Sequence, residues 1–128
     1  MNKEAVRTES APGPFQGAPY SQAIRAGGFV FVSGQLALLP GGHELVAGGI
    51  EAQTEQIFTN LAAILEAAGS SLDRLVKTTV FLQRLDDFGA MNEVYKRHVG
   101  DTPPARSTVE VAKLPSGALV EIEAIALA

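Results

Sequence analysis

Residues 50–82, which read IEAQTEQIFTNLAAILEAAGSSLDRLVKTTVFL, decide the fold of this 128-residue chain. In the first part of this stretch, apolar side chains recur at helical spacing and form a stripe of Ile57, Leu61, Ile64, Leu65 and Ala68. Gly69 is a suitable stop for a helix, and residues 75–82 are rich in the β-branched residues that are typical of a buried strand. We therefore predict a helix over residues 50–68 and a strand over residues 75–82. The rest of the helix carries the polar residues Gln53, Gln56, Asn60 and Glu66.

Upstream of the helix, two apolar segments over residues 22–25 and 29–33 flank Gly27-Gly28. This spacing predicts two strands joined by a two-residue turn. Residues 9–19 contain three prolines and two glycines, which favour an irregular loop. Because residues 29–82 then form a strand–helix–strand unit, we expect a right-handed parallel crossover.

Downstream, Asp86-Asp87 is suited to cap a second helix over residues 88–99, whose predicted inward side chains are Met91, Val94, Tyr95 and Val99. Two prolines end it, and two final strands follow, separated by residues 114–117. The element order predicts one α+β domain over residues 1–128, with a single mixed β-sheet and both helices packed on one face. The other face is left bare, and we expect other subunits to cover it.

Composition narrows the classes of function. Apolar residues make up 46% of the chain, and the net charge of −4 with no domain-wide basic footprint predicts no nucleic-acid partner. The absence of cysteine excludes disulfides, thiol nucleophiles and zinc–thiolate sites. No apolar run has the length of a membrane span and no signal peptide is visible, so we expect no membrane partner and a cytoplasmic location.

Charged residues within the last two predicted strands are the strongest candidates for chemistry, because a strand core is a costly place for charge. Arg106 has the geometry to clamp a substrate carboxylate; the alternatives are a salt bridge to Glu121 or Glu110, or a solvated strand end. Glu121 and Glu123 share one face of their strand. Burial would raise the pKa of Glu121 and a neighbouring Arg106 would lower it, and in both cases the carboxylate can orient or activate water. For Glu123 we favour a solvated position.

Other residue types give weaker signals. Tyr20 is a candidate packing anchor and Ser33 a candidate strand-end cap. His43 and His98 have no partner at metal-ligand or catalytic spacing, and we expect both at the surface. No phosphate-binding loop and no metal-spaced cluster occurs in the sequence. A site without cofactor or metal is predicted by elimination.

Several motifs together resemble the RidA family of reactive-intermediate (imine/enamine) deaminases over about residues 6–126. They are Pro19-Tyr20-Ser21-Gln22-Ala23, Val32-Ser33-Gly34-Gln35, Lys77-Thr78-Thr79-Val80-Phe81-Leu82, Pro104-Ala105-Arg106-Ser107 and Val120-Glu121-Ile122-Glu123-Ala124.

The resemblance implies a role for each matching residue. Arg106 would bind the substrate carboxylate, Glu121 would position or activate the attacking water, and backbone N–H groups near Ser107 could steady developing charge. The remaining residues of the implied cleft are Tyr20, Ser33, Gly34, Asn92 and Thr108. Two positions depart from the family pattern. Ala18 stands where glycine is common, and Thr108 stands where some members have cysteine, which excludes thiol chemistry.

The resemblance also implies a chorismate-mutase-like fold, a homotrimer with sites between subunits, and a last strand inserted into the middle of the sheet. A simple hairpin would instead place Arg106 opposite Glu121, so sequence spacing does not establish their contact. The implied reaction is the cofactor-independent hydrolysis of 2-iminobutanoate or 2-iminopropanoate, in equilibrium with enamines such as 2-aminoacrylate, to 2-keto acids and ammonia. Pyridoxal-phosphate-dependent dehydratases release such intermediates. The alternatives are a ligand-binding or regulatory trimer without turnover, and an RNA-cleaving or chaperone-like protein.

Overall fold

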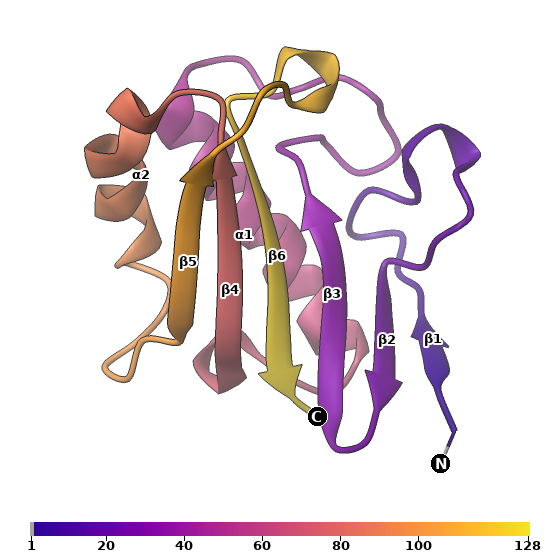
Figure 1. Cartoon of the computed structure of the whole chain (residues 1–128). Coiled ribbons are helices and arrows are strands. Elements are labelled where there is room, and N and C mark those ends of the chain that lie inside the picture. The colour runs from indigo at the N-terminus through magenta and orange to yellow at the C-terminus, as the bar shows by residue number, and fades with distance from the viewer. Residues whose placement is uncertain (1) are drawn as a thin grey trace.

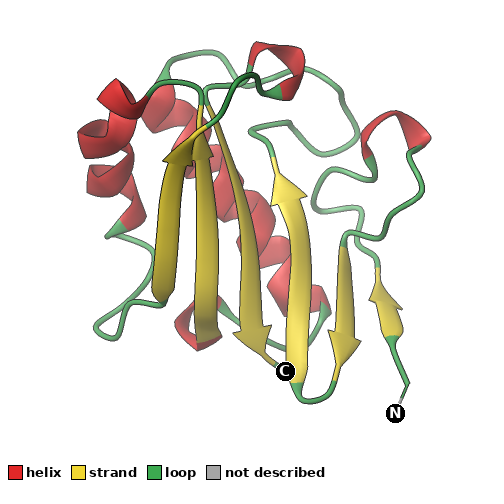
Figure 2. Ribbon diagram, viewed as in Figure 1, coloured by secondary structure: helices red, strands yellow, loops and turns green. Residues whose placement is uncertain are grey.

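The computed structural model describes residues 2–128 and contains one six-stranded mixed sheet with two α-helices (Figures 1 and 2). The strands are β1 (Glu4–Val6), β2 (Ala23–Ala26), β3 (Phe29–Gln35), β4 (Leu75–Leu82), β5 (Ala105–Glu110) and β6 (Val120–Leu127). The helices are α1 (Ile50–Ala67) and α2 (Phe88–Tyr95). Both helices lie behind the sheet in the view of Figure 1, on the same face. The predicted α+β class and helix placement are confirmed.

The strand order is β1-β2-β3-β6-β4-β5, so the C-terminal strand lies between β3 and β4 (Figure 1). Strand β6 is antiparallel to both neighbours, which makes β3 and β4 parallel to each other on either side of it, with α1 as their connection. Strands β4 and β5 are adjacent and parallel, joined through α2. The insertion of the last strand agrees with the family resemblance and excludes a β5–β6 hairpin.

The N-terminal strand β1 was absent from the predicted element order, and this is a correction. Its three residues pair with β2, and Val6 is buried over the core. A segment of three residues is too short to show the alternating pattern by which a strand is recognised. Its pairing extends the sheet by one edge strand.

Helix α1 buries the predicted apolar stripe and ends one residue earlier than expected. Gly69, with φ of 81°, follows the helix, and the Ser70 N–H donates to the Leu65 carbonyl at 2.8 Å. This is the geometry of a Schellman stop, in which glycine adopts the left-handed conformation. Two polar residues assigned to the rest of the helix, Gln53 and Asn60, are instead buried among the apolar side chains.

Helix α2 ends at Tyr95, four residues before the predicted end. The N–H groups of Arg97 and His98 donate to the carbonyls three residues before them, which tightens the chain into turns. Within residues 2–128, the expected Asp87 cap makes no side-chain capping hydrogen bond: its Oδ1 contacts Arg84 at 3.3 Å, and its buried Oδ2 has no hydrogen-bond partner. The predicted inward residues remain buried, Val99 included.

The core lies between the helices and one face of the sheet, and the opposite face is uncovered in the single chain. Large apolar side chains on this bare face include Phe29, Phe31, Val109 and Leu127, which are 38%, 44%, 44% and 42% exposed. Along β6 the alternation is strict: Val120, Ile122, Ala124 and Ala126 are buried, whereas Glu121 and Glu123 belong to the bare face. Neither helix within residues 2–128 is long and apolar enough to cross a membrane.

Candidate functional site

A cavity of about 450 Å³ opens where the loop after β1, the end of β3 and the start of β6 meet. Four of the sequence-predicted residues line it: Tyr20, Ser33, Gly34 and Glu121. Its apolar lining comes from Pro12, Phe15, Leu36, Leu38 and Pro115, and Glu123 lies at the same cavity. The cavity therefore combines a carboxylate and hydroxyl groups with an apolar wall.

A β-bulge in β3 shapes the floor of this cavity. Val32 pairs with Ala124 and Gln35 with Ile122, so the two residues Ser33 and Gly34 stand opposite the single intervening position of β6. The Ser33 hydroxyl donates to the Ser21 carbonyl at 2.6 Å, which ties the bulge to the preceding loop. A Cβ at Gly34 would overlap Glu121 Oε2 and lie 3.0 Å from its Cδ. Glycine at this position lets the carboxylate rest against the backbone.

Tyr20 holds the loop that covers the cavity. Its hydroxyl oxygen accepts a hydrogen bond from the Phe15 N–H at 2.6 Å, and its side chain is 42% exposed. Gln16, which follows Phe15 in the chain, adopts a left-handed φ of 53°. The tyrosine is therefore both a cavity wall and the anchor of a tight turn.

Glu121 is partly buried in the cavity wall. Burial raises the pKa of its carboxyl group above the ordinary value, and the nearby charge of Glu123 raises it further. Of the two directions that the sequence left open, the structure supports the upward shift, because no cation stands beside the carboxylate: none of the ion pairs within residues 2–128 includes Glu121.

Arg106 belongs to a second cluster, on the helix-covered face at the edge of the sheet. It pairs with buried Thr78 of β4, and its guanidinium carbon lies 4.7 Å from the ring centroid of Tyr95 and 5.4 Å from that of Phe88. Asn92, on the same side of α2, and Thr108, two residues along β5, each have a buried oxygen without a hydrogen-bond partner within residues 2–128. The backbone of Ser107 lies between Arg106 and Thr108, and its side chain points to the bare face with that of its partner Thr79.

The two clusters lie on opposite faces of one sheet. Thr78 pairs with Arg106, whereas Phe81, three residues further along β4, pairs with Glu121. Positions separated by three residues on a strand point to opposite faces. A salt bridge from Arg106 to Glu121 is therefore excluded within one chain, and the Glu110 carboxylate instead accepts from the Leu85 N–H at 2.8 Å. Arg106 also forms no ion pair with any other residue of the part that the structure describes.

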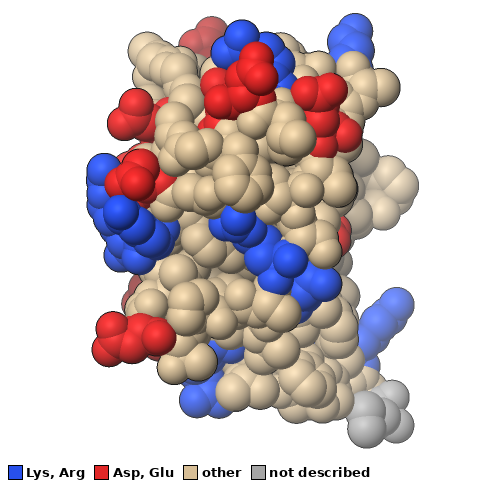
Figure 3. Space-filling view, turned by 60° about the vertical axis from the view of Figure 1, so that its left-hand side comes forward, with Lys and Arg blue, Asp and Glu red and all other residues tan. Residues whose placement is uncertain are grey.

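Basic side chains are visible on the side of the molecule that carries α2 and β5. Figure 3 turns the α2 and β5 side of the molecule forward and shows Lys and Arg side chains across the middle of this side, with acidic side chains gathered mainly above them. The net charge of −4 is thus unevenly distributed over the surface.

Three buried amide side chains that the sequence interpretation missed hold the cavity walls. Gln22 donates to the carbonyls of Thr8, Ala11 and Pro12 at 3.0, 3.2 and 2.8 Å. Asn60 donates to the Leu38 carbonyl at 3.0 Å, and Gln53 accepts from the Leu119 N–H at 2.9 Å. The sequence could have predicted the burial of Gln53 and Asn60, because both share the helical spacing of the apolar stripe.

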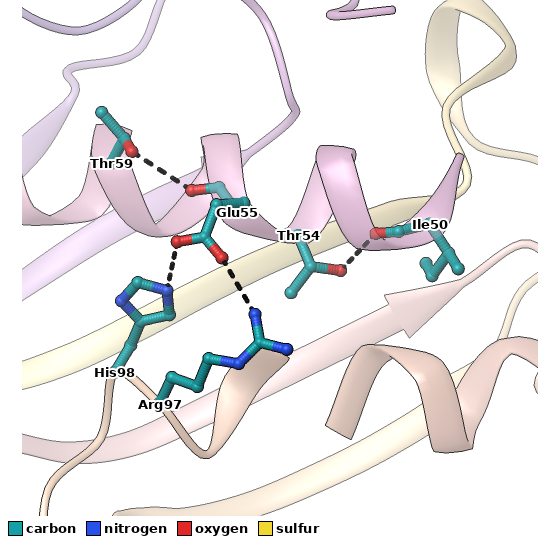
Figure 4. Close-up of polar contacts among 6 residues, drawn as sticks. All are labelled: Ile50, Thr54, Glu55, Thr59, Arg97 and His98. Atoms are coloured by element: carbon teal, nitrogen blue, oxygen red, sulfur yellow. Dashed lines mark hydrogen bonds and ion pairs between the residues drawn. The ribbon is translucent and has the colours of Figure 1, made fainter. Parts of the chain in front are cut away.

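The two histidines lie outside these clusters. His98 Nε2 is 2.7 Å from Glu55 Oε1, and Arg97 lies 3.8 Å from the other carboxylate oxygen (Figure 4). The His98 ring is stacked on Phe58 at 4.7 Å, so it is partly covered and not fully at the surface. His43 makes an edge contact with Phe15 at 6.5 Å. Within residues 2–128, no group of three or more His, Cys, Asp or Glu side chains is arranged to hold a metal ion.

Comparison with known proteins assigns this chain to a family. The family model described as endoribonuclease L-PSP matches residues 8–128. A RutC family protein of Pyrococcus horikoshii is 52% identical over 124 residues, which cover 97% of each chain. A chloroplastic Reactive Intermediate Deaminase A of Arabidopsis thaliana is 46% identical over 126 residues, which cover 98% of this chain and 66% of that protein.

Solved structures agree with this assignment. The structure of E. coli TdcF with bound serine is similar with a TM-score of 0.89 at 40% identity, over 98% of each chain. The match thus extends over the sheet and both helices. The chain belongs to the endoribonuclease L-PSP family, the family of the RutC and RidA proteins, which includes reactive intermediate deaminases.

Proposed function

We propose that this protein is a cofactor-independent deaminase that hydrolyses 2-iminobutanoate and 2-iminopropanoate to 2-keto acids and ammonia. The observation that carries the proposal is the pair of complementary clusters: an arginine that has no carboxylate partner within residues 2–128, and a carboxylate with a raised pKa in a cavity. A 2-imino acid needs both, because one end is an anion and the other must be attacked by water.

In this mechanism Arg106 binds the substrate carboxylate through its planar pair of N–H donors. Glu121 takes a proton from water while the water oxygen bonds to the carbon of the protonated imine. The same proton then passes to the nitrogen of the resulting carbinolamine. As the C–N bond breaks and ammonia leaves, Glu121 takes the proton of the hydroxyl group, which becomes the keto oxygen, and later releases this proton to solvent. A carboxyl group with a raised pKa suits this exchange of roles as base and acid. Backbone N–H groups near Ser107 would steady charge that develops on the substrate.

The other predicted residues complete the binding site. Tyr20, Ser33 and Gly34 form the cavity around Glu121, and Asn92 and Thr108 contribute unpartnered buried oxygens beside Arg106. Such oxygens are rare in folded proteins unless something pairs with them. In our proposal the substrate or a bound water supplies that partner.

The two clusters meet, we propose, between subunits of a homotrimer. Within one chain they lie on opposite faces of the sheet, so one substrate cannot contact both. The bare face also exposes apolar side chains that association would bury. A cyclic arrangement in which the Arg106 side of one subunit meets the Glu121 cavity of the next satisfies both observations.

Two relatives support the substrate class. One is named a reactive intermediate deaminase, and the E. coli TdcF structure contains serine, a ligand with a carboxylate and a nitrogen on the adjacent carbon. The geometry gives no separate support for RNA cleavage, because His98 is engaged by Glu55 and stacked on Phe58.

The test is turnover of freshly generated imine. A pyridoxal-phosphate-dependent dehydratase acting on threonine or serine generates 2-iminobutanoate or 2-iminopropanoate. Semicarbazide, which reacts faster with the protonated imine than with the keto acid, reports how long the imine persists. We expect the protein to shorten its lifetime and to accelerate keto-acid formation. Binding of 2-ketobutanoate without any acceleration of imine hydrolysis would favour the ligand-binding alternative. Cleavage of RNA without any acceleration of imine hydrolysis would favour the RNA-cleaving alternative.

A further inference from the structure

The surroundings of Arg106 are aromatic. Its guanidinium carbon lies 4.7 Å from the Tyr95 ring centroid and 5.4 Å from the Phe88 ring centroid. Both distances fall within the range of cation–π attraction. None of the ion pairs within residues 2–128 involves this arginine.

Tyr95 is held in place by Thr78 and Phe58. Its hydroxyl lies 2.5 Å from the hydroxyl of Thr78, which is fully buried and is the cross-strand partner of Arg106. Its ring meets Phe58 of α1 edge-on, with centroids 5.4 Å apart. The residue is 5% exposed, so its ring has little freedom, whereas Phe88 is 39% exposed and forms the outer contact.

This arrangement holds the arginine without a carboxylate partner within residues 2–128. A carboxylate partner would occupy the N–H groups that lie in the plane of the guanidinium. Two aromatic rings and one hydroxyl group occupy fewer of these N–H groups than a bidentate carboxylate would, which leaves donors for a ligand. Long arginine side chains otherwise lose considerable conformational freedom when they bind a ligand.

From these contacts we infer that Tyr95 is a positioning residue, which together with Phe88 holds the Arg106 guanidinium ready to bind the carboxylate of the substrate. The inference rests on the proposed function of Arg106. Its mechanism is a preformed clamp, in which the tyrosine acts through the arginine and does not touch the substrate.

The experiment measures binding of 2-ketobutanoate and of its uncharged methyl ester by calorimetry, to the wild-type protein and to Tyr95→Leu, Tyr95→Phe and Phe88→Leu. We expect Tyr95→Leu to weaken binding of the keto acid roughly tenfold and to leave the ester unchanged. Tyr95→Phe keeps the ring and should retain most of the affinity. On an Arg106→Ala background, Tyr95→Leu should have no further effect, because the group that it positions is gone.

Equal weakening of keto acid and ester, or additive losses on the Arg106→Ala background, would overturn the inference and assign Tyr95 a purely structural role. If Tyr95→Leu does not fold, Phe88→Leu carries the test, because this exposed ring is replaced without opening the core. Unchanged keto-acid binding by Phe88→Leu would then reject the aromatic clamp. If Arg106→Ala itself binds the keto acid normally, the proposed function fails first, and the two failures are thereby distinguished.

Discussion

Gly34 and Glu121 lie so close together that no other residue fits at position 34 without moving the carboxylate. The bulge in β3 brings the backbone of Gly34 against the side chain that projects from β6. The position of the acidic group is therefore set by the absence of a side chain on the neighbouring strand.

Replacement of Gly34 by alanine should displace the Glu121 carboxylate and lower imine hydrolysis by about 10-fold to 100-fold, because misplacement of a catalytic group by about 1 Å is costly. The carboxylate is the end of a flexible side chain, so the melting temperature should change little. Gly89→Ala is the matched control: a Cβ there meets nothing within 4 Å, and activity should be retained. Comparable activity of the two variants would contradict this role of Gly34.

Glu121→Gln should keep affinity for 2-ketobutanoate but lose most imine hydrolysis, because an amide cannot take the proton from water. Glu123→Gln changes a neighbouring carboxylate on the same face and should stay close to wild type in the dehydratase-coupled assay. If the two variants behave the other way round, the catalytic carboxylate is Glu123.

The raised pKa of Glu121 also has a consequence for stability. Because burial and Glu123 raise the pKa in the folded state above the unfolded value, folding is favoured by protonation, and stability is lost as the pH rises through the folded-state pKa. Glu121→Gln removes this loss of stability, because the amide group does not ionise. Thermal melts should show the variant more stable than wild type at pH 7 to 8, with the difference disappearing near pH 4. A difference that is independent of pH would indicate that the carboxyl group is not destabilised by burial.

Arg106→Ala removes two charge-assisted hydrogen bonds to the substrate carboxylate, each worth roughly 1.5–3 kcal/mol. At about 1.4 kcal/mol per decade, kcat/KM should fall by at least about 100-fold. Arg106→Lys should recover little of this, because an ammonium group lacks the planar fork. The free energy of unfolding should fall by no more than about 2 kcal/mol, the size of a cation–π contact with a largely buried ring. A large loss of stability with normal turnover per folded molecule would instead indicate a structural arginine.

Mixing two inactive variants tests whether the site is shared between subunits. Light scattering should give about three times the 13.4 kDa mass of one chain. In trimers reassembled from equal amounts of Arg106→Ala and Glu121→Gln chains, roughly a quarter of the interfaces contain both native residues, so activity should return to roughly that fraction of wild type. Each variant taken alone through the same reassembly is the control. A site contained in one chain would give no recovery.

Local patterns were sufficient for most elements. The helical stripe of α1, the Gly27-Gly28 turn and the alternation that places Glu121 and Glu123 on one face all depend on neighbours in the sequence, and the structure confirms them. Strand β1 was not predicted, because three residues are too few to show an alternating pattern. The end of α2 was predicted too late in the chain, because tight turns replace the helix before Val99. The buried amides Gln53 and Asn60 were misplaced because side-chain polarity was given more weight than their helical spacing.

The sequence by itself determined which residues carry charge in the strands and which face of its own strand each occupies, because strand periodicity is local. Local spacing did not determine that β6 inserts between β3 and β4, because strand order depends on pairings between distant segments. The family resemblance implied this insertion, and only the tertiary structure shows which strands flank β6 and in what register. This insertion puts Glu121 into the β3 cavity and leaves Arg106 at the far edge, beside the rings of α2. Two residues that a hairpin would have paired are thereby separated onto opposite faces of one sheet.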